Sequence, residues 1–222
     1  MNHIWEQWPQ IWAGFLSTVE FSVIAILLGT VIGLIAALMK LARFAPARWL
    51  STVYVELFRG TPLLVQLFFI ALGLPAVLPL NKWFGPQTYP LVAGAVGLAL
   101  NEGAYITEII RAGILGVDRG QWEAAASIGM SRGQTMRHII LPQAFKRMIP
   151  PLVNQFAQTV KDTSLLAPIA ITELVYSAQE VISVYFNAFS MWLVVALMYF
   201  VVIFLITRFA AYLERRLQID KR

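Results

Sequence analysis

Five long apolar runs, separated by short polar segments, restrict what this chain can fold into more than any other feature. They fall at about 13–39, 53–73, 89–110, 150–171 and 190–212. A helix of roughly 20 residues crosses the hydrocarbon core of a bilayer, about 30 Å thick. Only 13% of the residues are charged, whereas soluble domains carry about 25%. Because a chain in lipid must pair its backbone N–H and C=O groups internally, these runs predict helices. We therefore predict an all-α polytopic membrane protein, with residues 1–222 as one transmembrane domain of about five helices.

The basic residues predict how these helices are oriented. Fifteen of the seventeen Lys and Arg residues lie around the link between the first two runs, after the third run, or in the C-terminal tail. The loop after the fourth run, 170–189, holds Glu173 and Glu180 but no Lys or Arg. Loops rich in Lys and Arg stay on the cytoplasmic side. We expect an external N-terminus and a cytoplasmic C-terminus, and the basic balance needs no nucleic-acid partner.

Residue types that support common catalytic chemistry are scarce. The chain has no cysteine, which excludes disulfides, thiolate metal sites and cysteine nucleophiles. Its two histidines are far apart in the sequence, so we expect no zinc cluster. Glu102 and Glu108 are six residues apart and lie on different faces of a helix, a poor arrangement for paired-carboxylate chemistry. We therefore expect neither a metal site nor an intramembrane enzyme.

A polar stretch after the third run begins with a predicted short helix over 120–128. Glu123 is expected in its first turn, where a carboxylate favours the positive end of the helix dipole. The three alanines that follow are strong helix formers. Gly129 comes just after them, at the place where a left-handed residue commonly ends a helix.

A second short helix is predicted directly after this glycine. Ser131 and Gln134 match a capping box, which starts a helix, and Pro142 predicts a break after it. The two helices would form a hairpin inside a cytoplasmic loop, 116–149. A hairpin of this size cannot bury a core of its own, so it must pack against either the membrane domain or a separate protein.

The spacing of residues in this loop resembles a known motif, EAA---G---------I-LP. The matching positions are Glu123, Ala124, Ala125, Gly129, Ile139, Leu141 and Pro142. This motif is similar to the signature loop of permease subunits of bacterial binding-protein-dependent ABC importers. Further segments are similar to the polar amino-acid subfamily, whose members carry histidine, arginine, glutamine, glutamate or cystine. These segments are FRGTPL at 58–63, RAGILGVDRGQWEAAASIGM at 111–130, LPQAF at 141–145 and KDTSL at 161–165.

The resemblance implies that the hairpin is a coupling helix, which docks on a cytoplasmic ATPase. Glu123 would make a polar contact with the ATPase, and Ala124 and Ala125 would provide a close fit. Gly129 would set the bend that presents the helix. The ATPase would be a separate subunit, because this chain lacks the phosphate-binding sequence G-x-x-x-x-G-K-[ST]. ATP and Mg²⁺ would be bound by that partner, and this chain would hold no cofactor.

The resemblance also implies a larger assembly in the bacterial inner membrane. Its expected partners are two ATP-binding subunits, a second permease chain that is identical or paralogous, an external amino-acid-binding protein, and lipid. Within the loop, Ile139, Leu141 and Pro142 would brace the hairpin against the membrane helices.

The fourth apolar run carries the most polar side chains. Gln155, Gln158, Thr159 and Asp162 recur at helical spacing and share one face. A charge at the centre of a span costs about 2.5–3.5 kcal/mol on insertion scales. One interpretation is a substrate site, in which Asp162 accepts hydrogen bonds from an ammonium group or a cationic side chain. The other is that Lys161 and Asp162 are structural charges that pair with neighbouring helices.

The residue at position 155 bears on the substrate that the resemblance implies. In relatives that carry cationic amino acids, we expect an acidic residue at the position of Gln155. Its absence puts arginine or lysine in doubt and favours a neutral polar amino acid such as glutamine or cystine.

Polar residues of the third run could complete this site. Asn101 and Tyr105 lie one helical turn apart, and Glu108 follows near the cytoplasmic end. An ion pair with Arg111, three residues further on, is the alternative explanation for Glu108.

A second pair with this spacing, Glu56 and Arg59, precedes Pro62 in the second run. Because proline removes a helical hydrogen bond, Pro62 could serve as a gating hinge or form a plain kink.

The main functional hypothesis is a permease subunit that moves a polar amino acid by alternating access, driven by a partner ATPase. The alternative is a secondary transporter or channel that acts without an ATPase. The motif loop and the lack of a paired inverted repeat disfavour that alternative.

Overall fold

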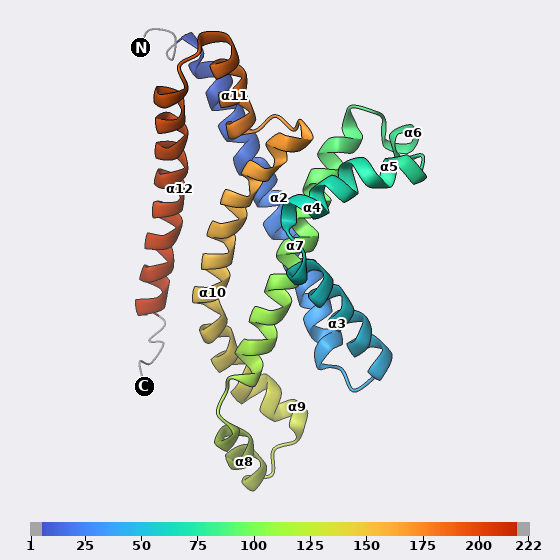
Figure 1. The fold of residues 1–222 in the computed structure, drawn as a ribbon. Coiled ribbons are helices and arrows are strands. Elements are labelled where there is room, and N and C mark those ends of the chain that lie inside the picture. Colours follow the sequence, from blue (N-terminus) through green and yellow to red (C-terminus); the bar gives the residue numbers. More distant parts are fainter. Residues whose placement is uncertain (1–5, 217–222) are drawn as a thin grey trace.

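The computed structural model describes residues 6–216, and every regular element in this range is a helix. Helices α2 (Trp8–Leu41) and α7 (Thr88–Leu115) lie against each other in the middle of the molecule and form its most extensive helix–helix contact (Figure 1). The other helices that pack on α7 come from both halves of the chain. The predicted all-α class is confirmed.

Small residues bring α2 and α7 close together. A Cβ atom on Gly33 would lie 2.7 Å from the side chain of Ile106 and 2.9 Å from the carbonyl oxygen of Gly103. The hydroxyl of Thr107 also donates a hydrogen bond of 3.3 Å to the carbonyl of Gly33. Contacts of this kind let helix backbones touch without bulky side chains between them. This pair is therefore the packed centre on which the rest of the bundle is built.

The second apolar run forms a sharply bent element. Its helices are α3 (Ala45–Gly60), α4 (Leu63–Phe68), the π-helical turn η1 (Phe69–Gly73), α5 (Leu74–Val77) and the short α6 (Leu80–Phe84). The parts before and after Thr61 and Pro62 meet at 107°. Pro62 has extended backbone angles and no N–H, so the helical hydrogen bonding stops there. Figure 1 shows α5 and α6 extending away from the rest of the bundle.

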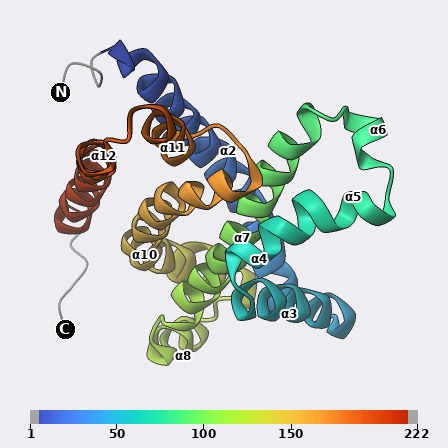
Figure 2. The same ribbon diagram turned by 45° about the horizontal axis from the view of Figure 1, so that its top comes forward.

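The last two apolar runs also form helices. They are α10 (Leu141–Asp162), the 3₁₀ turn η3 (Thr163–Ile169), α11 (Leu174–Tyr185) and α12 (Ala188–Arg216). The helical element Arg132–Ile169, which ends with η3, meets helix α11 at an angle of 48°. Helix α12 contacts α10 and α11 along one side of the molecule (Figure 2). Of the 18 consecutive residues of α12 with the highest mean hydropathy, only 11% are buried within the chain.

By length and composition, the described residues contain two to four candidate membrane spans, where the sequence predicted five. Helices α2 and α12 qualify alone, and each of the two bent pairs qualifies if it counts as one span. Helix α7 is long enough, with 28 residues, but it is more polar because it carries Asn101, Glu102 and Glu108. Since other helices surround α7, it needs little apolar surface of its own.

A helical hairpin projects from the end of the bundle where α7 ends and α10 begins (Figure 1). It consists of α8 (Arg119–Ser127), α9 (Arg132–Thr135) and the π-helical turn η2 (Met136–Ile140). Gly129 has φ +81°, the left-handed conformation that glycine adopts without strain. Ser131 and Gln134 make both hydrogen bonds of a capping box. The predicted pair of helices, the glycine turn and the cap are confirmed.

Two details of the predicted hairpin are wrong. Helix α8 begins at Arg119, and the carboxylate of Asp118 accepts a hydrogen bond of 2.6 Å from the N–H of Gly120. Glu123 therefore lies in the second turn, beyond the N-terminal end of the helix. Pro142 does not break the chain into separate helices: residues 132–162 are continuously helical, and Pro142 follows the π-helical turn η2 in the first turn of α10.

Candidate functional site

The hairpin exposes part of the motif and buries the rest. Glu123 and Ala124 are exposed, whereas Ala125 is buried. Ile128, at the tip, is 76% exposed. An open groove of about 740 Å³ lies between the hairpin and the end of α2. Its lining residues are Leu41, Arg43, Trp122, Glu123, Ala126, Met130, Arg132, Gly133, Thr135 and Met136. The hairpin thus presents a mixed polar and apolar surface at one end of the molecule.

An apolar cluster joins the hairpin to the membrane helices. Its buried residues are Ile114, Val117, Ile140, Ala144 and Met148, and Ile139 packs against them. Of the three residues expected to brace the hairpin, Ile139 therefore makes this contact. Leu141 is 42% exposed and Pro142 is exposed as well. The bracing in this chain comes mainly from positions 140, 144 and 148, which follow one face of the helix one turn apart.

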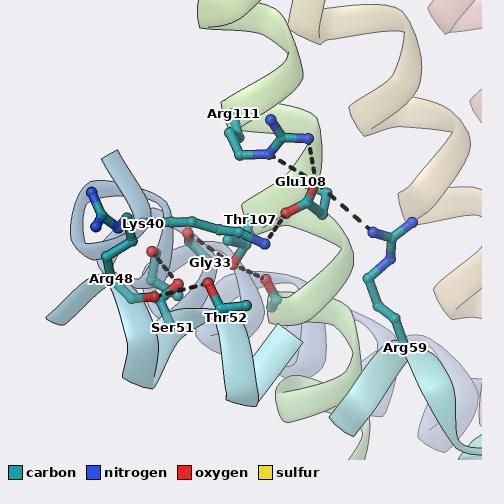
Figure 3. A network of polar contacts seen from close by, with 11 residues as sticks. Gly33, Lys40, Arg48, Ser51, Thr52, Arg59, Thr107, Glu108 and Arg111 are labelled. Atoms are coloured by element: carbon teal, nitrogen blue, oxygen red, sulfur yellow. Dashed lines mark hydrogen bonds and ion pairs between the residues drawn. The ribbon is translucent and has the colours of Figure 1, made fainter. Parts of the chain in front are cut away.

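Glu108 lies at the centre of a cluster of positive charges (Figure 3). Its carboxylate is 2.5 Å from Nζ of Lys40 and 2.8 Å from a guanidinium nitrogen of Arg111. Arg59 approaches the same carboxylate at 4.0 Å. The predicted pair of Glu108 and Arg111 is confirmed, and the additional cations tie α2, α3 and α7 together close to the hairpin.

Arg59 does not pair with Glu56, so the predicted ion pair between these two residues is wrong. Within residues 6–216, Glu56 is exposed and makes no ion pair. The guanidinium of Arg59 instead lies 5.2 Å from the centre of the Tyr105 ring, within the range of a cation–π contact. This contact connects the last turn of α3, directly before the bend at Pro62, to α7.

An open cavity of about 550 Å³ lies between α3, α7 and α10. Its lining residues are Arg59, Tyr105, Glu108, Ile109, Ala112, Gly113, Gly116, Arg147, Pro151 and Gln155. The guanidinium of Arg147 donates a hydrogen bond to the carbonyl of Gly116, and both residues line this cavity. The cavity brings together Tyr105 and Gln155, two of the residues predicted to bind substrate.

Behind the cavity, Gln155 and Thr159 meet a buried carboxylate. The amide of Gln155 donates a hydrogen bond of 2.9 Å to Glu102, and the hydroxyl of Thr159 donates to the same oxygen. Glu102 is only 2% exposed. The sequence reasoning did not include Glu102 among the substrate-site residues. The cost of placing a carboxylate in the middle of an apolar run was the signal that could have identified it.

The other predicted site residues divide into two groups. Gln158 donates a hydrogen bond of 2.8 Å to Asp162, one turn along α10, and Lys161 is exposed. Asn101 instead donates to Gln66 at 3.0 Å and to the carbonyl of Phe58 at 3.2 Å. Asn101 thus joins α7 to the bend between α3 and α4, one helical turn from Tyr105. Within residues 6–216, no group of His, Asp and Glu side chains is arranged to hold a metal ion.

A helical membrane bundle with an open cavity between its helices and a projecting hairpin is typical of a translocation subunit. Residues 29–219 match the family model described as "Binding-protein-dependent transport system inner membrane component". The chain therefore belongs to the permease family of binding-protein-dependent ABC transporters. Permeases of this family are multi-pass inner-membrane proteins without a cofactor or catalytic activity, and the ATPase and the binding protein are separate partners.

Similar proteins match nearly the whole chain. The L-cystine transport system permease protein TcyB of Bacillus subtilis is 39% identical over 95% of this chain and 87% of its own length. The glutamine transport system permease protein GlnP of Escherichia coli is 37% identical over 97% of this chain and 96% of its own. The crystal structure of an amino acid ABC transporter with histidines has a TM-score of 0.87 and 36% identity, covering 96% of both chains.

Proposed function

We propose that this chain is the transmembrane subunit of an ATP-driven importer that moves a polar L-amino acid into the cell by alternating access. The substrate class is that of glutamine, cystine, histidine, arginine or glutamate. Relatives named for cystine and glutamine transport support this class. The projecting α8–α9 hairpin is the observation that carries the proposal, because it offers a docking site for a separate ATPase subunit.

The proposed topology has five spans, with the N-terminus outside and the C-terminus and hairpin in the cytoplasm. Helices α2, α7 and α12 would each cross once. The bent element from α3 to α5 would be the second span, and α10 with α11 the fourth. The high content of Lys and Arg in the hairpin and at the end of α12 supports this orientation.

In the assembled importer, the hairpin of each permease chain would dock on one of two ATP-binding subunits. The exposed Glu123 would make the polar contact, Ala124 and Ala125 the close approach, and Gly129 the bend. Residues Ile139, Leu141 and Pro142 would position the second arm. ATP-driven closure of the ATPase would then move the hairpins together and switch the permease between outward-facing and inward-facing states, because ATP binds these two states with different affinity.

The permease would act as a pair of chains, identical or paralogous, surrounded by lipid. The apolar surface of α12, which is largely unburied within one chain, supports contacts with lipid and with a second chain. An external binding protein would deliver the amino acid to the opposite side from the hairpin. Nucleic acid has no part in this assembly.

The amino acid would pass through the cavity between α3, α7 and α10. Tyr105 and Gln155 line this cavity, and Gln158, Thr159 and Asp162 follow on the same helix as Gln155. Asn101 would hold the bend between α3 and α4 in place beside the site, and Lys161 would serve as a structural charge.

The bend at Pro62 would act as a gating hinge. Arg59, one turn before it, contacts Tyr105 in the wall of the cavity, so a change of the bend angle would move this side chain. Glu56 would remain exposed on the same helix, α3.

Uptake into proteoliposomes tests the proposal. The permease is reconstituted with its ATPase and binding protein, and uptake of radiolabelled glutamine, cystine, arginine and histidine is measured with and without ATP. We expect ATP-dependent uptake of at least one of them. Glu123→Lys should abolish uptake, because it reverses the charge on the docking surface.

The matched control is Glu123→Gln, which keeps a polar side chain of the same shape and should retain much of the uptake. Both variants should insert into the membrane in normal amounts. Normal ATP-dependent uptake by Glu123→Lys would contradict the docking role. Uptake by the permease alone would support a secondary transporter or channel instead.

A further inference from the structure

The carboxylate of Glu102 lies at the meeting point of three helices. Gly29 of α2 allows the close approach, since a Cβ atom there would lie 2.7 Å from the Glu102 side chain. From α10, Gln155 and Thr159 both donate to Oε2 of Glu102. Oε1 is buried and has no hydrogen-bond partner within the described residues. Leaving a buried carboxylate oxygen unpaired is costly, so packing alone does not explain a glutamate here.

Gln155 connects this buried carboxylate to the cavity. Its side chain lines the cavity and also donates its amide N–H to Glu102 at 2.9 Å. A carboxylate only accepts hydrogen bonds, so the amide must turn its NH₂ group toward Glu102. The carbonyl oxygen of Gln155 then faces away from Glu102 as the acceptor that the amide offers to a ligand, and the second N–H remains a donor. Glu102 therefore determines how the amide at position 155 is oriented.

A second glutamine on α10 is oriented in the same way. Gln158 donates its amide N–H to Asp162 at 2.8 Å, which again leaves the carbonyl oxygen to accept. Asp162 also lies near enough to Glu102 for the two side chains to interact electrostatically. Two oriented amides of α10 thus lie beside two carboxylates, Asp162 of α10 and Glu102 of α7. Such a surface is complementary to hydrogen-bond donors and unfavourable for an anion.

We propose that Glu102 is a specificity-determining positioning residue, which fixes the Gln155 amide so that the site selects amino acids whose side chain ends in an N–H donor. Glutamine and arginine belong to this class, and glutamate does not. This inference rests on the proposed amino-acid transport. It also revises the expectation drawn from position 155, because the acidic group missing from α10 is supplied by α7 one hydrogen bond away.

Direct binding to the purified permease–ATPase complex tests this inference. The binding protein is left out, so that any selectivity measured belongs to the permease. Equilibrium binding of radiolabelled glutamine, arginine and glutamate is compared for the wild type and the variant Glu102→Gln. We expect the wild type to bind glutamine and arginine, with glutamate at least about tenfold weaker. Because a glutamine at 102 can donate as well as accept, the Gln155 amide is released, and binding of both favoured ligands should weaken about tenfold.

A double variant separates positioning from a structural role. Glu102→Gln combined with Gln155→Glu restores one carboxylate and one amide in contact, with their places exchanged. It should recover arginine binding and raise the ratio of arginine to glutamine binding above that of the wild type. The control is Glu173→Gln at another buried carboxylate, which lies between α2, α11 and α12. It should lower the thermal midpoint of unfolding without changing the order of the three ligands.

The possible outcomes distinguish this inference from the proposed function. Equal binding of glutamate and glutamine by the wild type would overturn the inference alone. An unchanged ligand order in Glu102→Gln and in the double variant, with only a lower thermal midpoint, would do the same. If the reconstituted wild type showed no ATP-dependent uptake and the purified complex bound none of the amino acids, both the proposed function and the inference would fail.

Discussion

Glu108 is the residue at which charge contributes most clearly to the stability of the bundle. Lys40 and Glu108 are both mostly buried, with side chains 17% and 16% exposed, and Arg111 completes the pairing. In Glu108→Gln these cations lose their counter-charge while remaining partly removed from water. We expect a loss of about 1–2 kcal/mol, below the cost of breaking a fully buried pair, because solvent still reaches the arginine. The thermal midpoint of the detergent-purified protein should fall measurably.

Glu56→Gln is the matched control for this prediction. Glu56 is exposed and makes no ion pair within the part of the chain that the structure describes. Its substitution should change the stability by less than about 0.5 kcal/mol, as is usual for surface positions. Equal effects of the two substitutions would show that the ion cluster around Glu108 contributes nothing specific.

At the scale of single residues, sequence separation explains which contacts could be predicted. The pair of Glu108 and Arg111 follows from helical spacing alone, since residues three apart are neighbours on a helix. The contact of Lys40 with Glu108 spans 68 residues, and that of Glu102 with Gln155 spans 53. No local rule reports which distant helices meet. The same limitation made the pairing of Arg59 with Glu56 a wrong prediction, because Tyr105 and Glu108 come from another helix.

At the scale of elements, the capping box should control how firmly the second arm of the hairpin is held. Ser131→Ala removes the side chain that accepts from the N–H of Gln134. Loss of such a cap costs about 1 kcal/mol. We expect hydrogen exchange of the amides in Arg132–Thr135 to become about fivefold faster, while α7 and α10 exchange at unchanged rates. Hydrogen–deuterium exchange with mass spectrometry measures this directly.

Ser127→Ala provides the comparison within the same hairpin. The hydroxyl of Ser127 only donates to the carbonyl of Ala124, one turn back in α8. Since Ala124 is exposed and its carbonyl can bind water instead, the substitution should leave exchange in α9 unchanged. Faster exchange of α9 in both variants would mean that the hairpin loosens as a unit and that the capping box has no special role.

Elements were predictable where local chemistry decides them. The glycine turn and the capping box are short-range features, and both are present in the structure. The 107° bend at Pro62 is different, because proline permits a break while the packing of α3 and α4 on α7 sets its angle. Pro142 shows the converse, since the preceding π-helical turn lets the chain remain helical through a proline.

At the scale of the whole molecule, the fold places two exposed apolar side chains at opposite ends. Ile128 is at the tip of the hairpin, and Phe189, 83% exposed, begins α12 near the turn from α11 (Figure 1). Because the chain has no cysteine, a single cysteine at either position gives a thiol at one end only. A maleimide that carries a photoreactive group can then report which partner lies beside each end.

With Ile128→Cys, we expect light-dependent crosslinking of the permease to the ATPase in the assembled complex. Phe189→Cys, labelled in the same way, should give no product with the ATPase, since the length of the bundle separates the two positions. Addition of ATP should change the crosslinking yield at position 128 but not at position 189, because the hairpin would move with the ATPase subunits when they close. A product between the ATPase and position 189, or none at position 128, would mean that the hairpin is not where the motor attaches. The groove beside Glu123 would then bind something other than the ATPase, and the ATPase would have to contact the bundle at a different element.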